Sequence, residues 1–78
     1  MDAYQQRFHD FLMSMVQSGN ESAAEAILAR SFAQQDAGSF TLDAIDAAVD
    51  ELTPLVKAES VVKLQDAAQA MRRQASQG

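Results

Sequence analysis

The stretch between Phe40 and Val56 constrains the fold more than any other part of this chain. Its apolar residues recur at alternating steps of three and four, which is the spacing of one helix face. They are Leu42, Ile45, Val49, Leu52 and Val56. Thr41 stands just before this face and can cap the helix with its side-chain oxygen. The preceding Phe40 can contact Ile45 as a hydrophobic staple, so the stretch predicts an amphipathic helix with a defined start.

Pro54 interrupts the later part of this helix. Inside a helix, a proline removes one backbone hydrogen bond and clashes with the preceding turn, which costs about 3 kcal/mol or more. The apolar spacing nevertheless continues through Leu55 and Val56. Two interpretations follow. Either the helix bends at Pro54, or it ends near Leu52 and restarts with Thr53 as the cap and Pro54 in the first position.

Three further helical stretches flank this one, over residues 3–17, 21–35 and from about 61 onward. Their apolar faces are Tyr4, Phe8, Phe11, Leu12 and Met15; Ala24, Ile27, Leu28, Ser31 and Phe32; and Val61, Leu64, Ala68, Met71 and Ala75. The last face is out of step with that of the third helix, which predicts a break near residues 57–60. Because the connections are short, successive helices should be antiparallel neighbours. We expect an all-α fold, a small four-helix up-and-down bundle in which residues 1–78 form a single helical domain and the third helix is kinked or broken at Pro54.

The connections carry recognisable turn and cap residues. Gly19 can end the first helix in the left-handed conformation, and Gly38 can end the second. Either Ser18 or Asn20 can cap the second helix, and the sequence does not choose between them. Ser60 is the candidate cap of the fourth helix.

The charge balance excludes one broad class of partner. The net charge is −5, and the six Lys and Arg residues are spread from Arg7 to Arg73. Because binding to phosphate needs Lys and Arg gathered on one face, we expect no nucleic acid partner. A helix-turn-helix made of the second and third helices would place Asp43, Asp46 and Asp50 beside phosphates, so it is excluded on the same ground.

The composition also bears on location. The chain has no cysteine, which excludes disulfides and thiolate metal sites and fits a reducing compartment. No run approaches the roughly 20 apolar residues that cross a bilayer, so we expect no membrane insertion. Residues 1–20 lack the basic start and apolar core of a signal peptide. We therefore expect a cytoplasmic protein.

Residues 33–44 resemble the calcium loop of the EF-hand family in frame, with Gly38 at its glycine position and Phe40 at its apolar eighth position. The positions that should supply ligands hold Ala33, Gln35, Ala37 and Ala44. Calcium needs several carboxylate oxygens, so this site is excluded. His9 is the single histidine and lies at the edge of an apolar face, where a boundary residue is expected rather than a proton-transfer group. We expect no catalytic residue, no cofactor and no metal.

Two apolar side chains lie off the predicted faces, Met13 on the first helix and Val62 on the last. Asp43, Asp46 and Asp50 form an acidic stripe on the third helix, opposite its apolar face. A chain of 78 residues buries only a modest core and gains from a partner. We interpret it as a non-enzymatic helical protein–protein interaction module, a small regulatory, immunity-type or accessory protein. It would bind a protein partner or itself as a homodimer, with these five residues as the possible interaction surface.

One alternative function rests on residues 38–43, Gly-Ser-Phe-Thr-Leu-Asp. This stretch resembles the Asp-Ser-Leu motif of acyl carrier proteins, small acidic helical bundles that attach phosphopantetheine to a serine at the start of a helix. The resemblance implies a carrier modified at Ser39. Here Gly38 replaces the aspartate and Phe40 the leucine, and residues 21–35 predict a firm helix where that family has a long loop.

Overall fold

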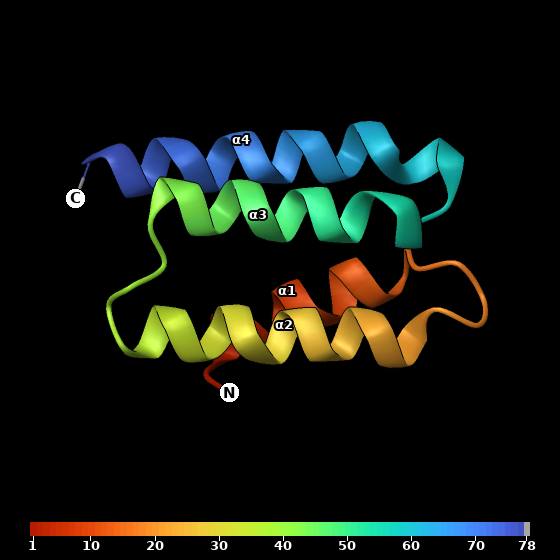
Figure 1. The fold of residues 1–78 in the computed structure, drawn as a ribbon, viewed down its shortest axis with the longest axis horizontal. Helices are drawn as coiled ribbons and strands as arrows, with labels where there is room; N and C mark the ends of the chain where they lie inside the picture. Colours follow the sequence, from red (N-terminus) through yellow and green to blue (C-terminus); the bar gives the residue numbers. More distant parts are fainter. Residues whose placement is uncertain (78) are drawn as a thin grey trace.

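The computed structural model describes residues 1–77, in which four α-helices are joined by short connections (Figure 1). The helices are α1 (Ala3–Met13), α2 (Glu21–Asp36), α3 (Leu42–Leu52) and α4 (Val61–Gln77). Two 3₁₀ turns, η1 (Thr53–Leu55) and η2 (Ala58–Ser60), lie between α3 and α4. Successive helices run in opposite directions, so the predicted four-helix up-and-down bundle is confirmed (Figure 1). The radius of gyration is 11.8 Å, close to the value of about 11.5 Å for a compact chain of this length.

Side-chain caps fix the starts of α1 and α3. The Asp2 carboxylate accepts from the backbone N–H of Gln5 at 2.8 Å, and the Gln5 side chain accepts from the N–H of Asp2, which completes a capping box. Thr41 accepts from the N–H of Ala44 at 3.3 Å, as the sequence predicts. Phe40 packs against the cluster that contains Ile45, which agrees with the predicted staple.

Gly38 ends α2 in the left-handed conformation, with a φ of +74°. Its N–H donates to the carbonyl of Gln35 at 3.1 Å, and the N–H of Ser39 donates to that of Gln34 at 2.8 Å. These two bonds form a Schellman motif and satisfy carbonyls that the helix end would otherwise leave unpaired. The connection to α3 is therefore short and well defined.

The third helix is broken rather than bent. The α-helix ends at Leu52, and Pro54 lies exposed in the 3₁₀ turn η1. The Thr53 hydroxyl donates back to the carbonyl of Val49 at 2.7 Å, so Thr53 does not cap a new helix. Val56 and Lys57 are extended, and η2 leads directly into α4, which confirms the predicted break near residues 57–60.

The prediction that the first helix reaches Gln17 is wrong, because α1 ends at Met13. The chain leaves the helix so that Val16 can form an antiparallel bridge with Val56. Two backbone hydrogen bonds of 2.9 Å flank the bridge, from the N–H of Gln17 to the carbonyl of Leu55 and from the N–H of Lys57 to the carbonyl of Met15. We call this arrangement the loop clasp, because it ties the α1–α2 connection to the α3–α4 connection.

Lys57→Pro is expected to lower the free energy of unfolding by about 1 kcal/mol, because it removes the N–H that donates to Met15. The backbone already suits proline: Lys57 has a φ of −62°, and the preceding Val56 is extended. The loss should therefore report the hydrogen bond rather than strain. Urea unfolding followed by circular dichroism measures it, with Lys57→Ala as the control that keeps the N–H. Because a proline at a compatible position otherwise stabilises a protein by about 0.4–1 kcal/mol through the unfolded chain, a Lys57→Pro variant more stable than Lys57→Ala by that amount would show that the clasp bond contributes nothing.

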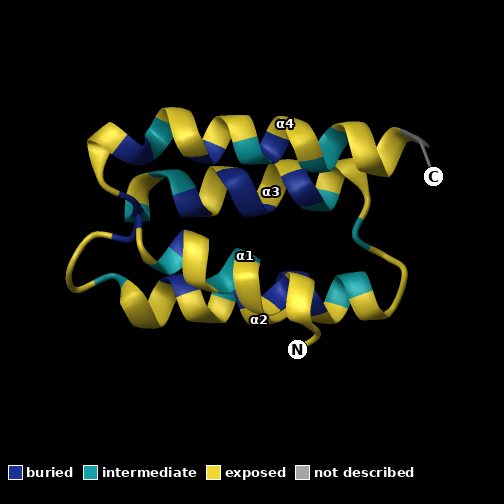
Figure 2. Cartoon of the chain, turned by 180° about the vertical axis from the view of Figure 1, so that it is seen from behind, coloured by how far each residue is buried: buried dark blue, intermediate teal, exposed yellow. Residues whose placement is uncertain are grey.

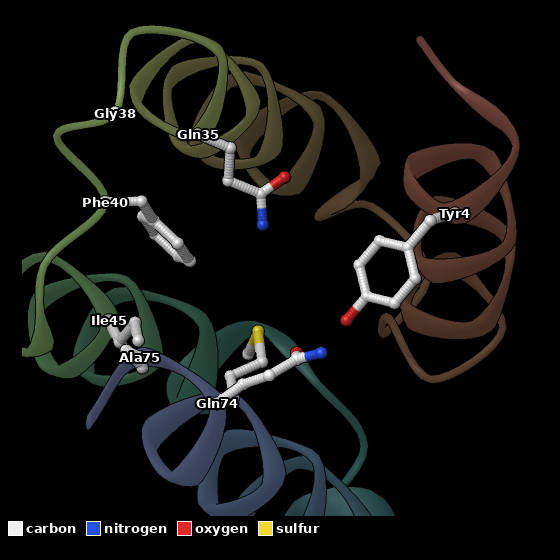
Figure 3. Close-up of a pocket in the computed structure, with 8 residues that line it drawn as sticks. Tyr4, Gln35, Gly38, Phe40, Ile45, Gln74 and Ala75 are labelled. Atoms are coloured by element: carbon white, nitrogen blue, oxygen red, sulfur yellow. The ribbon is translucent and has the colours of Figure 1, made fainter. Parts of the chain in front are cut away.

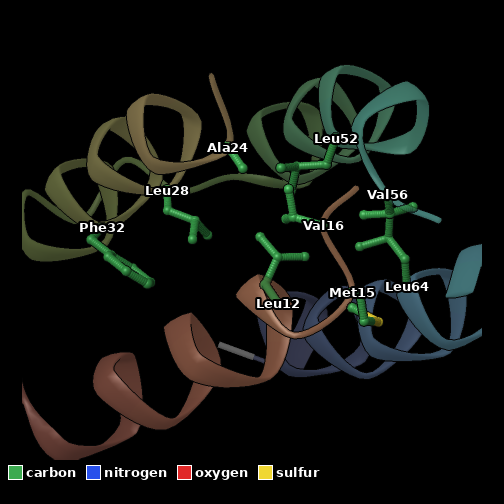
Figure 4. Close-up of a cluster of buried hydrophobic side chains, with 9 residues drawn as sticks. All are labelled: Leu12, Met15, Val16, Ala24, Leu28, Phe32, Leu52, Val56 and Leu64. Carbon is green, nitrogen blue, oxygen red and sulfur yellow. The ribbon is translucent and has the colours of Figure 1, made fainter. Parts of the chain in front are cut away.

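The core consists of two clusters that meet between the helices. The larger one draws on every helix and on both clasped connections (Figure 4). Its buried members are Leu12, Met15, Val16, Ala24, Leu28, Phe32, Leu52, Val56 and Leu64. The smaller cluster is built by α3 and α4 from Ile45, Val49 and Ala68, with Phe40 and Met71 packed against it. Buried residues line the inward side of each helix, as expected for helices with one apolar face (Figure 2).

The first helix is rolled relative to its predicted apolar face. Tyr4 and Phe11, which were expected inside, are 47% and 41% exposed. Gln5, which was not expected inside, is 3% exposed. It is satisfied there because its side-chain amide donates to the Gln35 side chain at 3.0 Å and to the Asp36 carboxylate at 3.2 Å. A polar interhelical contact, rather than the apolar pattern alone, therefore sets the roll of α1.

Candidate functional site

The bundle is hollowed at one end, between the beginning of α1 and the last turns of α4. A hollow of about 300 Å³ lies there. Figure 3 shows Tyr4 of α1 and Gln74 of α4 facing it from different sides, with Gln35 and Phe40 along the remaining wall. Its lining consists of Tyr4, Gln35, Gly38, Phe40, Ile45, Met71, Gln74 and Ala75. No lining side chain is charged, so the hollow offers apolar surface with amide and phenol groups.

A second hollow, of about 560 Å³, adjoins the first and shares Gly38, Phe40 and Ala75 with it. Its other lining residues are Thr41, Leu42 and Asp43. We call the two hollows together the end surface. Its apolar part includes the exposed side chains of Tyr4 and Leu42, the latter 45% exposed.

Local structure explains why this end stays open. The Schellman turn at Gly38 and the cap at Thr41 force the chain across the end of the bundle, so that Phe40 and Leu42 lie at its rim. On the α1 side, burial of Gln5 turns the neighbouring Tyr4 outward. Packing behind the rim is also incomplete, because an interior void of about 20 Å³ has Phe40 among its lining residues.

The seam between α1 and α2 holds the single histidine. His9 Nε2 lies 2.5 Å from a carboxylate oxygen of Glu25, and Nδ1 lies 3.1 Å from one of Asp10. The hydrogen bond with Glu25, followed by that with Asp10, raises the pKa of His9 above its ordinary value of 6.5. The protonated ring can donate to both carboxylates, so it fastens α1 to α2.

We expect the stability contribution of His9 to depend on pH. Because the folded state raises the pKa of His9, the contribution is fully present below pH 6.5 and is lost as the pH rises through the folded-state pKa. Urea unfolding of the native chain and of His9→Gln at a series of pH values measures it. The difference in free energy of unfolding should shrink toward alkaline pH, and a constant difference would contradict this assignment. Gln65→Ala, an exposed change on α4 that leaves both carboxylate partners of His9 in place, is the control.

The five residues predicted as an interaction surface are not gathered in one place. Met13 is half-buried and packs against the larger core cluster, so little of it is available, whereas Val62 is 69% exposed. These two lie at the end of α1 and the start of α4, at the opposite end of the bundle from the start of α3 (Figure 1). Asp43, Asp46 and Asp50 are all exposed. Only Asp43 lines the end surface.

Ion pairs occupy part of the acidic stripe and its neighbourhood. Asp46 accepts from Arg72 of α4 at 2.7 Å. Arg30 of α2 pairs with Glu51 of α3 through a two-pronged contact, which lowers the pKa of the Glu51 carboxyl. These pairs join neighbouring helices at exposed positions, where each adds little to stability. The sequence predicts that these helices are neighbours but not these two pairs, because adjacency does not state which side chains face each other across the helix contact.

Ser39, the residue of the carrier alternative, is exposed in the α2–α3 connection, two residues before the Thr41 cap. Its backbone N–H belongs to the Schellman motif, and its hydroxyl donates to the carbonyl of Gln34. This geometry is that of a turn residue rather than of a serine that begins a helix. Asn20 occupies the cap position of α2, but its side chain donates to the carbonyl of Leu55 at 3.2 Å instead of capping.

Residues 1–77 contain no group of three or more His, Asp or Glu side chains arranged to hold a metal ion. Across this same part of the chain, every helix is too short or too polar to cross a lipid bilayer. The residues that line the end surface offer apolar contact and hydrogen bonding, with one carboxylate at its rim.

Comparison with known proteins found no matching family model, no matching curated protein and no matching solved structure.

Proposed function

We propose that this chain is a non-enzymatic helical protein-interaction module, a small cytoplasmic regulatory, immunity-type or accessory protein, which binds its partner through the end surface. One observation carries the proposal: Tyr4 and Leu42 expose apolar surface beside two hollows that the chain does not fill. Aromatic and apolar anchors at a pocket are the usual centre of protein interfaces. The placement in the cytoplasm rests on the lack of cysteine.

The accessible surface area supports a transient partner rather than an obligate one. The accessible surface is 4730 Å², whereas a monomeric globular protein of this mass exposes about 4,600 Å². The larger core cluster is already closed by residues of all four helices. A partner is thus not required to complete the core, and the end surface is available for reversible binding. A second copy of the chain is the alternative occupant, as a homodimer.

Photo-crosslinking within the host cell tests the proposal. A photoreactive phenylalanine derivative replaces Leu42 in the full chain, and a matched variant carries it in place of Val62, which is exposed at the other end of the bundle. We expect a discrete crosslinked protein from position 42, absent from position 62 and weakened by Tyr4→Ser. Equal products from both positions, or none, would refute binding at the end surface.

Sedimentation separates the two kinds of occupant. If the purified chain stays monomeric at high concentration, the homodimer is excluded and the crosslinked species must be another protein. If it dimerises, Tyr4→Ser should weaken the dimer and Val62→Ser should not.

A further inference from the structure

A short series of hydrogen bonds fixes the orientation of the Gln5 side-chain amide. A separate hollow of about 300 Å³ follows the seam between α1 and α2, and its lining includes Gln5 and Asp36. The Gln5 nitrogen lies 3.2 Å from the Asp36 carboxylate, which can only accept, and the Gln5 oxygen accepts from the N–H of Asp2. The buried Gln5 amide therefore has a single orientation, with its nitrogen toward α2.

The orientation of Gln35 follows from that of Gln5. The Gln5 nitrogen donates to the Gln35 side chain at 3.0 Å, so the atom of Gln35 that it meets must be the oxygen. The nitrogen of the Gln35 amide is consequently turned away from α1, toward the middle of the hollow that Tyr4 and Gln74 also face, which we call the first hollow (Figure 3). Within residues 1–77 this nitrogen has no acceptor, and it is not shut off from the surface. The first hollow thus contains an N–H donor of fixed direction.

The charges around the first hollow favour an uncharged ligand. No side chain in its lining is charged. Charged residues nearby have both signs: Asp43 lines the adjoining second hollow, Arg73 directly precedes Gln74, and Asp36 lines the seam hollow instead. An ionic group that entered the first hollow would lose hydration without gaining an opposite charge in the lining.

The floor of the first hollow is apolar and incompletely packed. The interior void of about 20 Å³ lies behind it and shares Phe40, Ile45 and Met71 with its lining. Apart from Gln35, the one polar residue around the void is Ser31, whose hydroxyl already donates to the α2 backbone. Because a buried water needs at least two polar partners, the void suits an apolar group better than water. The half-buried Met71 is flexible enough to let the hollow extend into the void.

We propose that the first hollow binds a small uncharged molecule that joins a carbonyl group to an apolar body, such as an aliphatic amide or ketone. The carbonyl oxygen accepts from the Gln35 nitrogen, and the apolar body contacts Phe40, Ile45 and Met71. The volume of about 300 Å³ is at the lower end of the range of about 300–1,000 Å³ for small-molecule pockets. This inference goes beyond the proposed interaction function, because it assigns a small-molecule ligand to the chain itself.

Three probes with the same alkyl chain test the class of ligand: hexanamide, hexanoate and hexylammonium. Two-dimensional ¹⁵N NMR of the full chain follows their binding and detects the side-chain amide of Gln35 directly. We expect hexanamide to shift this signal with a Kd on the order of 1 mM or below. Either charged probe should bind at least about tenfold more weakly. Acetamide keeps the carbonyl and lacks the chain, so it should also bind at least about tenfold more weakly.

Matched variants test the hydrogen bond. Gln35→Glu replaces the donor by an acceptor, while the new carboxylate can still accept from Gln5; its missing NH₂ signal also identifies that of Gln35 in the native spectrum. We expect the affinity for hexanamide to fall about tenfold or more and that for hexylammonium to rise. Gln34→Glu adds the same charge one residue away, outside the hollow linings, and should leave both affinities nearly unchanged. Thermal unfolding by circular dichroism confirms that each variant is folded.

The native chain alone can already overturn the inference. It fails if hexanamide does not shift the Gln35 side-chain signal, or if the three alkyl probes bind equally, which would mean that the hollow takes an alkyl chain without regard to its head group. Undiminished binding of hexanamide to Gln35→Glu would remove the assigned donor. These titrations contain no protein partner, so crosslinking at position 42 decides the interaction function separately.

Discussion

Leu12→Ala is expected to lower the free energy of unfolding by about 2–5 kcal/mol, the range for a buried leucine whose removal leaves a cavity. Leu12 is fully buried, and it belongs to the cluster that joins all four helices. The other buried residue of α1 is Gln5, and its side chain is polar. Leu12 is therefore the main apolar anchor of a helix that is only 11 residues long. Such a helix is not stable when detached.

The expected loss is large compared with the total stability of a domain of this size, which is about 4–12 kcal/mol. Thermal unfolding should show it as a fall in Tm of more than about 10 °C. Leu42→Ala is the matched control, because it deletes the same atoms from a leucine that is 45% exposed. Its cost should be well under half that of Leu12→Ala. Similar costs would mean that α1 is not held through Leu12.

Gln5→Ala is expected to cost about 1–3 kcal/mol, the penalty for deleting one partner of a buried hydrogen-bonded set. It removes the amide that donates to Gln35 and Asp36, together with the side-chain half of the capping box at Asp2. The change also deletes packing between α1 and α2 at a position only 3% exposed. The loss should free the N-terminal turns of α1 before the rest of the bundle unfolds.

Urea unfolding and amide hydrogen exchange measure this effect. The control is Gln6→Ala, because the neighbouring Gln6 is exposed and contacts only Asp10 within its own helix. Exchange in α1 should become faster in Gln5→Ala and stay unchanged in Gln6→Ala. Indistinguishable stabilities would show that the buried amide does not hold the two helices together.

Much of the fold could be predicted from the sequence, because two signals agreed along most of it. On the third helix, the cap at Thr41 and the apolar face indicated the same start, which the structure confirms. The predicted face is buried at Ile45, Val49 and Leu52, but the prediction that Leu42 belongs to it is wrong, because Leu42 is 45% exposed. Gly38 specified a left-handed helix end by its lack of a side chain. The phase slip after Val56 located the break before α4.

The first helix shows why the rest could not be predicted. Its apolar residues, from Tyr4 to Met13, cover so wide an arc that more than one roll of the helix would bury an apolar stripe. Contacts from α2 choose among these rolls: Gln35 and Asp36 bind Gln5, and Glu25 binds His9. Such contacts lie far apart in the sequence and leave no periodic signal.

The candidate site was missed for the same reason. Its hollows arise where residues from the start of α1, the α2–α3 connection and the end of α4 meet, and Tyr4 and Phe40 were both assigned to packing roles. Of the five residues predicted as a surface, only Asp43 lies there, and it was chosen for its charge rather than for its neighbours. The prediction that Val62 and Asp50 contact a partner stays a prediction.

Because of the loop clasp, the two ends of the bundle should differ in how well they tolerate insertions and substitutions during evolution. Where Val16 pairs with Val56, two connections are bound to each other, so lengthening either one would break a shared set of backbone bonds. At the opposite end the chain crosses once, between Gly38 and Thr41, and within residues 1–77 no second segment is bridged to it. Inserted or exchanged residues should therefore be tolerated beside the hollows and rejected at the clasp. A lineage could diversify what the molecule binds while its scaffold stays fixed.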